Sequence, residues 1–517
     1  MTLLKSKAIT TVEKRIKGFL DGYRQNIAIL GKSKEQIKYI FENFIYEEKN
    51  RSLIYINVDI SYIDAKDIFK NVSRSILNQY LNTQDSLDGL INTAAGVLPT
   101  TTDYIKIILK RKRLSFMDIL ELINKFITET NKKCIFAIEE FPELQDIFDK
   151  YHQDFSKFIM LQKKCMIILK SSSIREAKKA LDSGLNLLFG NFETVLLGES
   201  STIDNYLFFS SLLKPLRHDP CFIAFFINIL SSNIEYYEVI TKKIKELHSD
   251  SDKQILVKSI ESLLYEKSSV IFQKFINRIE LIKGKYPRDS RGLIKLLLFI
   301  SEGYIRKGDI VSFSGLEKKR INSKLQRLLD TEYVENSGNL YRITDSLFSF
   351  WLSHVFKFYL SCPLDKKKRD NLFRKNMEEQ ISLFKEDFYK EKMQRILELF
   401  SAFKGDTIVI KKNRIKLPSL TRIKMVSYSE KKLNIIVGEG DEMLFAAVKE
   451  NDTDETDISN FDNITKSIKT KNLRKIFISL GKLETQAELV AKENKVSLWD
   501  SNEINRILKI YNKPIML

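Results

Sequence analysis

The chain has 517 residues, more than one hydrophobic core usually holds, so we expect three or four structural units. Apolar residues make up 43% of it and charged residues 29%, as in soluble globular proteins, and no stretch approaches the roughly 20 uncharged residues of a membrane span, so we expect no membrane partner. Lys and Arg exceed Asp and Glu by 85 to 67, a net charge of +18, which makes double-stranded DNA the first partner to expect.

The N-terminal residues 1–20 carry charges throughout and have no cleavage site after an apolar core. We therefore expect an amphipathic helix rather than a signal peptide, and a cytoplasmic protein. The cysteines lie far apart, without a CxxC pair or neighbouring histidines, which predicts buried free thiols and no metal site. They are Cys134, Cys165, Cys221 and Cys362.

The first part of the chain alternates short, branched apolar runs with helical stretches, the rhythm of a parallel β-sheet. The predicted strands are 26–30, 53–60, 134–141 and 165–173, with a helix near 34–47. Because parallel strands present their polar carboxyl ends at one sheet edge, we expect a ligand site there. The small and polar residues 84–103 predict an insertion or a mobile loop.

From about 200 to 290, apolar residues recur at three and four residue spacing, which predicts a helical lid. Residues 291–345 then predict a helix, a short helix, an amphipathic helix and a hairpin that turns at 337–339, the order of a winged helix-turn-helix. Its third helix, about 316–329, has a basic surface that suits phosphate contact better than base reading. Such modules also pack on neighbouring domains, which is the alternative. The residues expected on DNA are Lys318, Lys319, Arg320, Lys324 and Arg327.

A proline and a charge run at 363–371 predict a linker. The residues beyond it predict a second α/β domain. Its expected strands are 433–438, 443–450, 475–481 and 496–499.

A phosphate-binding loop would follow the strand 26–30, where backbone N–H groups wrap the phosphates and Lys and Ser/Thr reach the β/γ oxygens and magnesium. The pattern G-x4-G-K-[ST] needs glycine, lysine and a hydroxyl at 36–38. The chain has there Gln36, Ile37 and Lys38. A tripeptide Gly31-Lys32-Ser33 abuts the strand, so its lysine lacks the loop that would aim it, and it is at most a weak nucleotide site. No cofactor is certain, with ATP and Mg²⁺ left open.

The strand 134–141 ends in two acids, Glu139 and Glu140. They stand where a Walker B strand carries its magnesium ligand and its water-activating base. Two acids also simply solvate a strand end, so the pair alone does not define a site.

Several stretches together resemble the archaeal AAA/STAND-type P-loop ATPases that carry a winged helix and a PD-(D/E)xK nuclease-like domain. They are 26–33 (NIAILGKS), 135–144 (IFAIEEFPEL), 169–181, 187–192 and the aromatic-rich 340–356. The resemblance implies a polar sensor at Ser172 or Ser173, and an arginine where this chain has Asn191. Losing the loop lysine removes a charge that stabilises phosphoryl transfer, so we expect a pseudo-ATPase with Glu139 and Glu140 as vestiges.

The same resemblance implies a nuclease-like site, where carboxylates on neighbouring strands hold a metal and a lysine steadies the attacking water. Matching that lysine to Lys449 puts the acidic positions on Asn434 and Ala447. Only Lys449 remains, as a vestige. The nearby Glu439 and Asp441 are predicted to be turn residues. We therefore expect no metal and no metal-dependent cleavage.

The expected fold class is multidomain α/β. Its domains are a degenerate P-loop ATPase-like α/β domain (1–198), a helical lid (199–289), a winged helix-turn-helix (290–362) and a degenerate restriction-endonuclease-like domain (363–517). The expected function is that of a non-catalytic ATPase relative that associates with DNA through the winged helix and its basic surface. The alternatives are an active ATPase that uses Lys32 or Lys38 from an unusual loop, and a protein-interaction scaffold.

Overall fold

The computed structural model describes most of the chain, and the chain forms two compact units. The first unit is Met1–Ser200 with Asn233–Glu235, and the second is Ser201–Ser232 with Tyr236–Leu517. Among the described residues, no helix combines the length and the apolar character needed to cross a lipid bilayer. The described residues are 7–31, 34, 37–38, 53–61, 63–184, 192–197, 200–247, 251–315, 317–361, 365–410, 413–428, 433–466 and 472–517.

The first unit contains a five-stranded sheet in the order β2-β3-β4-β1-β5, and every neighbouring pair is parallel. The prediction of a parallel sheet from alternating apolar runs is therefore confirmed. The strands are β1 (Asn26–Leu30), β2 (Leu53–Asp59), β3 (Lys133–Glu139), β4 (Cys165–Ser171) and β5 (Phe192–Leu196).

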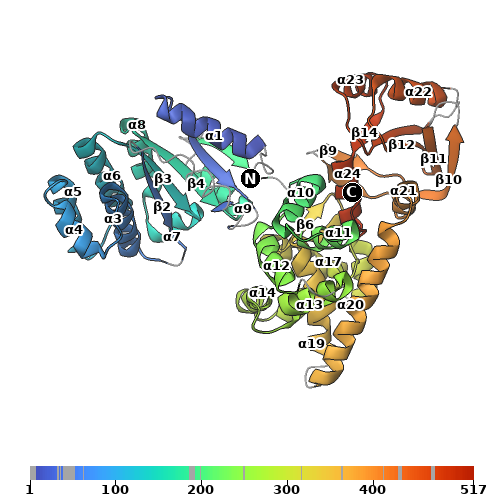
Figure 1. Ribbon diagram of the computed structural model, residues 1–517, viewed down its shortest axis with the longest axis horizontal. Helices are drawn as coiled ribbons and strands as arrows, with labels where there is room; N and C mark the ends of the chain where they lie inside the picture. Colours follow the sequence, from blue (N-terminus) through green and yellow to red (C-terminus); the bar gives the residue numbers. More distant parts are fainter. Residues whose placement is uncertain are drawn as a thin grey trace. The chain divides into compact units, whose positions relative to one another are not determined.

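Alternate strand residues face two separate apolar cores, because successive side chains of a strand point to opposite faces. Ile27 and Ile29 belong to the core that includes Val12 and Ile16 of α1, whereas Ala28 and Leu30 belong to the other core. Figure 1 shows α1 on one side of the sheet and α3 with α6 on the other. The helices of this unit include α1 (Lys7–Leu20), α3 (Ala65–Leu81), α6 (Phe116–Thr130), α7 (Leu144–Ile147), α8 (Tyr151–Leu161) and α9 (Ile174–Gly184).

The expectation that 84–103 is an insertion or a mobile loop is wrong as regards a loop, because the segment is largely helical. Two helices, α4 (Leu87–Ala94) and α5 (Pro99–Leu109), occupy most of this segment. Ser86 accepts a hydrogen bond from the N–H of Gly89 and so caps α4, and Pro99 stands in the first turn of α5. Small and polar residues that are typical of loops are also typical of helix starts. Leu90 and Ala94 are fully buried, which ties the segment into the core.

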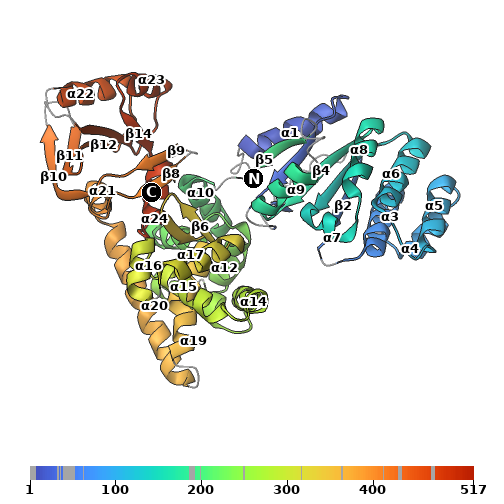
Figure 2. The same cartoon turned by 180° about the vertical axis from the view of Figure 1, so that it is seen from behind.

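The second unit begins with five helices, in agreement with the helical periodicity of its sequence. They are α10 (Thr202–Leu213), α11 (Pro220–Leu230), α12 (Ile234–Glu246), α13 (Asp252–Ile260) and α14 (Val270–Lys285). Three more helices and a hairpin follow, in the order predicted for 291–345 (Figure 2). They are α15 (Ser290–Ser301), α16 (Lys307–Ser314), α17 (Lys318–Asp330), β6 (Val334–Ser337) and β7 (Leu340–Ile343).

Residues 366–371 of the predicted linker instead begin the helix α20 (Lys366–Phe388), whereas 363 and 364 lie outside the described residues. Asp365 caps this helix by accepting a hydrogen bond from the N–H of Lys368. Buried apolar residues recur every four positions, at Phe373, Met377 and Ile381, so the helix packs along one face. The charge run is its first turn, in which Lys366, Lys367 and Lys368 are exposed and Arg369 is buried. The helices around it are α18 (Ser346–Trp351), α19 (Lys357–Ser361) and α21 (Lys392–Ser401).

The C-terminal part holds a five-stranded mixed sheet in the order β10-β11-β12-β13-β14. Its first three strands are antiparallel, whereas β12, β13 and β14 are parallel. The sequence pattern missed β8, which has only four residues, and β9 and β10, which are more polar. The elements are β8 (Thr407–Ile410), β9 (Asn413–Lys416), β10 (Leu420–Tyr428), β11 (Leu433–Gly440), β12 (Met443–Lys449), α22 (Glu455–Lys466), β13 (Leu473–Ser479), α23 (Thr485–Glu493), β14 (Ser497–Asp500) and α24 (Ser501–Ile510).

Candidate functional site

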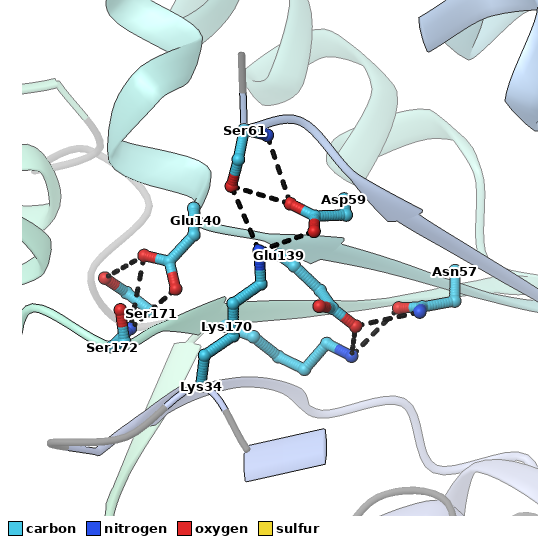
Figure 3. A network of polar contacts seen from close by, with 9 residues as sticks. All are labelled: Lys34, Asn57, Asp59, Ser61, Glu139, Glu140, Lys170, Ser171 and Ser172. Atoms are coloured by element: carbon cyan, nitrogen blue, oxygen red, sulfur yellow. Dashed lines mark hydrogen bonds and ion pairs between the residues drawn. The ribbon is translucent and has the colours of Figure 1, made fainter. Parts of the chain in front are cut away.

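The polar residues at the carboxyl edge of the first sheet form three neighbouring hydrogen-bonded groups, which contain Lys170, Glu140 and Lys34 respectively (Figure 3). Strand register brings them together, since Asp59 lies beside Glu139 and Glu139 lies beside Lys170 on adjacent strands. The expectation that the strand ends meet at one edge is therefore confirmed.

The first group is centred on Lys170, which contacts Glu139 and Asn57. Its Nζ lies 2.7 Å from Oε1 of Glu139 and 2.9 Å from Oδ1 of Asn57. Asn57 also donates to Oε1 of Glu139 at 2.8 Å. The Lys170 side chain is 2% exposed and that of Glu139 11%, so the ion pair is withdrawn from water. Oε1 of Glu139 thus already has a cation and an amide as partners.

Glu140 is held in a different way. Its backbone has a φ of 54°, in the left-handed region, which turns the chain sharply after β3. Both carboxylate oxygens accept from the N–H of Ser172, at 3.1 and 3.2 Å, and the Ser171 hydroxyl lies 3.4 Å from Oε2. Glu140, which is expected to be the water-activating base, is therefore hydrogen-bonded to the loop that contains the expected sensor, Ser172 or Ser173.

A second ion pair, which the sequence did not indicate, joins Lys34 to Asp59. Nζ of Lys34 lies 2.5 Å from Oδ2 of Asp59 and 3.2 Å from the hydroxyl of Ser61. Ser61 donates to Oδ1 of Asp59 from both its hydroxyl and its N–H. Burial raises the pKa of Asp59, but the hydrogen bonds from Lys34 and Ser61 outweigh it and hold that pKa below its ordinary value. For Lys34, burial lowers the pKa, but Asp59 raises it above the ordinary value.

The chain after β1 differs from a phosphate-binding loop at the residues that the structure describes. The N–H of Gly31 donates to the carbonyl of Ser171 at 3.1 Å, so it continues the sheet. Ile37, at the position that a P-loop lysine would take, is buried in the core against α1. A Cβ on Gly31 would lie 3.1 Å from its side chain. The other residues of the predicted weak nucleotide site, Lys32 and Ser33, lie outside the described residues, as does Asn191.

The five residues predicted to contact DNA divide into two groups on α17. Lys318, Lys319 and Arg320 are exposed in its first turn. Lys324 and Arg327 form ion pairs with one acid, Asp289, which precedes α15. The side chain of Lys324 is only 14% exposed. Arg320 has a longer contact of 3.8 Å with the exposed Glu317.

The turn of the hairpin β6–β7 is covered by another part of the second unit. The N–H of Asn339 donates to the carbonyl of Thr407 at 3.1 Å, and the Asn339 side chain accepts from the N–H of Thr407 at 2.8 Å. The Ser337 hydroxyl accepts from the N–H of Val409. A Cβ on Gly338, whose φ is 66°, would lie 2.0 Å from the carbonyl oxygen of Thr407. The hairpin turn therefore packs tightly on β8.

Lys449 lies at the end of β12, and its ammonium forms an ion pair with Asp457 in the first turn of α22. Asn434 and Ala447, at the positions expected for acids, lie on the adjacent strands β11 and β12, one residue out of direct register. Among the described residues, no group of three or more His, Cys, Asp or Glu is arranged to hold a metal ion.

Three of the cysteines are buried free thiols, as predicted, whereas Cys362 lies outside the described residues. Burial raises the pKa of Cys165 to about 12 and that of Cys221 to about 11. Burial also raises the pKa of Cys134. A high pKa disfavours the reactive thiolate, so these residues act as core side chains.

The parallel five-stranded sheet with its covering helices fits a P-loop NTPase-like α/β fold. No protein-family model matches the chain, and no curated protein matches it. It is similar to a Walker-type ATPase of Pyrococcus abyssi, with 15% identity over 68% of this chain and 95% of that one and a TM-score of 0.47. It is also similar to the ORC2 protein of Aeropyrum pernix, with 10% identity, 73% and 95% coverage and a TM-score of 0.45. It is similar as well to the ORC1 protein of Aeropyrum pernix in complex with DNA, with 10% identity over 70% of this chain and 95% of that one and a TM-score of 0.36.

Proposed function

We propose that this protein is a non-hydrolysing relative of P-loop ATPases that associates with double-stranded DNA in the cytoplasm. The observation that carries the first half is the contact between Lys170 and Glu139. In a working Walker B site, the acid at this position helps to hold Mg²⁺, which neutralises the charge that develops on the transferred phosphoryl group. Here a buried ammonium already neutralises that acid.

Two further features support the absence of hydrolysis. The apolar Ile37 is buried where a P-loop lysine would reach the β/γ phosphates. The carboxylate oxygens of Glu140 are engaged by the Ser172 N–H. Both features argue against the alternative of an active ATPase with an unusual loop, because such a site would need these side chains in other positions.

Release of phosphate from ATP in the presence of Mg²⁺ tests this half of the proposal. Wild type and Glu140→Gln are both expected to stay at the background rate of a sample without protein. Turnover by the wild type that Glu140→Gln abolishes would falsify the proposal, because it would identify Glu140 as a working base.

The second half rests on the exposed first turn of α17. We infer that residues 290–362 form a winged helix-turn-helix, in which α17 is the helix that approaches DNA. Lys318, Lys319 and Arg320 stand at the N-terminal end of this helix, where such helices contact the duplex. Their ammonium and guanidinium groups suit phosphate oxygens, which supports binding without strong sequence preference.

Binding of a fluorescent random-sequence duplex across a salt series tests the DNA association. The wild type is expected to bind at low salt, with an affinity that falls steeply as salt rises. Changing Lys318, Lys319 and Arg320 to alanine is expected to flatten this dependence by roughly 0.9 in log–log slope for each phosphate that is no longer neutralised. No binding by the wild type even at low salt would overturn this half.

A scaffold role is the second candidate, and the covered hairpin turn favours it. Gly338 and Asn339 are committed to Thr407, so this part of the module serves packing within the chain. We infer that the mixed sheet of the C-terminal part is a restriction-endonuclease-like domain that has lost cleavage and retains a structural role. Salt-insensitive binding of a protein partner, with no affinity for duplex, would favour the scaffold over the DNA-associated function.

A further inference from the structure

Two strongly basic segments of the second unit meet at the end of α14. Residues 283–295, which we call the basic corner, contain one acid, Asp289, and five basic residues. These are Lys283, Lys285, Arg288, Arg291 and Lys295. The helix α17 likewise contains five basic residues and one acid, Asp330. The helix α15 packs against both α14 and α17 (Figure 2).

Specific contacts fix the corner against α17. Asp289 stands at the start of α15, but its carboxylate makes no capping hydrogen bond to that helix. It pairs instead with Lys324, at 2.5 Å, and with Arg327. The guanidinium of Arg327 also lies over the ring of Tyr286, 5.7 Å from its centroid, and Nζ of Lys285 lies 5.8 Å from the same centroid. Lys324 passes so close to Gly292 that a Cβ there would lie 2.9 Å from its Nζ.

This arrangement holds like charges together, which costs free energy unless counter-charges are present. Asp289 neutralises at most one of the two cations that it contacts. Arg288 and Arg291 remain exposed on either side of it, and Arg320 lies one turn before Lys324 on the same face of α17. The exposed charge therefore continues from the start of α17, past Asp289, onto the corner. A partner with regularly spaced negative charges fits such a surface.

We propose that the basic corner and α17 form one continuous surface for the phosphate backbone of duplex DNA, an inference that rests on the proposed DNA association. In this arrangement Asp289 is a positioning residue that sets Lys324 and Arg327 beside Arg288 and Arg291. The hairpin turn, which contacts the backbone in many winged helices, is covered by β8. The corner therefore supplies the second set of phosphate contacts in its place.

Fluorescence anisotropy with a labelled 25-base-pair duplex tests the inference, with Arg288→Ala/Arg291→Ala compared with a matched control. The control is Lys367→Ala/Lys368→Ala, which removes the same net charge from exposed residues in the first turn of α20. The corner variant is expected to bind about tenfold more weakly, with a log–log salt slope flatter by about 1.8, since each phosphate that is no longer neutralised changes it by roughly 0.9. The control is expected to stay within about twofold of wild type. Arg288→Lys/Arg291→Lys, which keeps the charge, is expected to retain binding and shows that the weaker affinity is not misfolding.

The outcomes separate this inference from the function on which it rests. If the wild type binds no duplex, the DNA association itself fails. If the wild type binds, the triple change in α17 weakens it, and the corner variant matches its control, then the DNA association stands and the inference about the corner is overturned. A corner variant that loses binding only to vesicles containing phosphatidylserine, and not to duplex, also overturns it, because the surface would then recognise a membrane.

Discussion

The ammonium nitrogen of Lys170 lies 2.7 Å from Oε1 of Glu139, and the two residues are direct neighbours on the parallel strands β3 and β4. Lys449, which the sequence predicts to be a vestige of a nuclease-like site, is also paired within the chain, because its ammonium contacts Asp457. In both places a charge that would serve catalysis in a working enzyme is compensated within the chain. Removing one partner of such a pair would leave the charge of the other partner uncompensated.

Lys170→Met is expected to destabilise the first unit, because it leaves the carboxylate of Glu139 buried without its cation. Removing one partner of a buried ion pair commonly costs roughly 3–5 kcal/mol. The double variant Lys170→Met/Glu139→Leu is expected to recover part of that loss. Hydrogen–deuterium exchange of peptides from β3 and β4 measures the effect. Tryptophan fluorescence would not report on the first unit, because both tryptophans of the chain, Trp351 and Trp499, lie in the second unit. Equal protection in the single variant and the wild type would show that the pair contributes nothing.

No metal-dependent nuclease activity is expected from the C-terminal part. Asn434 and Ala447 provide no carboxylate, and Lys449 is held by Asp457. Supercoiled plasmid incubated with Mg²⁺ or Mn²⁺ is expected to remain supercoiled, with wild type and Lys449→Ala alike. Nicking that appears with the wild type and disappears with Lys449→Ala would contradict the expectation.

Gly338→Ala is expected to loosen the contact between the β6–β7 turn and β8. The added Cβ would meet the carbonyl oxygen of Thr407, and the left-handed φ of 66° alone costs a residue with a side chain roughly 1–3 kcal/mol. Gly308→Ala is the control, because it lies in α16 with nothing within 4 Å of its Cβ position, and it is expected to stabilise by about 0.5–1 kcal/mol. Urea unfolding followed by tryptophan fluorescence compares the two. Equal urea midpoints for Gly338→Ala and Gly308→Ala would contradict the tight packing of the turn on β8.

The ion pair between Arg306 and Asp406 is expected to make the second unit acid-sensitive. Two hydrogen bonds, of 2.8 and 2.7 Å, join these side chains, and the Tyr511 hydroxyl also donates to Asp406. Burial raises the pKa of Asp406, but Arg306 and Tyr511 outweigh it, so the folded-state pKa lies below the ordinary value. A depressed carboxyl pKa stabilises the fold above its unfolded-state value and loses that contribution as pH falls through the folded-state value.

Asp406→Asn tests this dependence. At neutral pH the variant is expected to be less stable than wild type by roughly 3–5 kcal/mol, because it removes the closer of the two carboxylates that pair with Arg306 and leaves only Asp309, at 3.8 Å. The difference is expected to shrink as pH falls below about 4, where the carboxyl of the unfolded chain takes up a proton while that of the folded protein, whose pKa is lower, still keeps its charge. Unfolding midpoints in urea, measured from pH 7 down to pH 3, give the comparison. A difference that is constant across this range would contradict the assignment.

The sequence by itself determined the local elements with strong periodicity. Apolar spacing predicts the strands near 26–30 and 165–171 and the helices of residues 202–285. A buried strand needs a continuous apolar run, and a helix that buries one face needs apolar residues three and four positions apart, whatever the segment packs against. The same reasoning failed at 84–103 and at 366–371, where residues common in loops serve as helix starts. Local composition does not distinguish these two uses.

The tertiary structure decided which charges meet. Lys170 and Glu139 are 31 residues apart, and Lys324 and Asp289 are 35 apart, so only strand register and helix packing bring each pair together. The covering of Gly338 by Thr407 likewise depends on a hairpin and a strand from distant parts of the chain. Periodicity reports which face of an element is buried, whereas the identity of the partner on that face depends on the packing of elements that the chain brings together only when it folds.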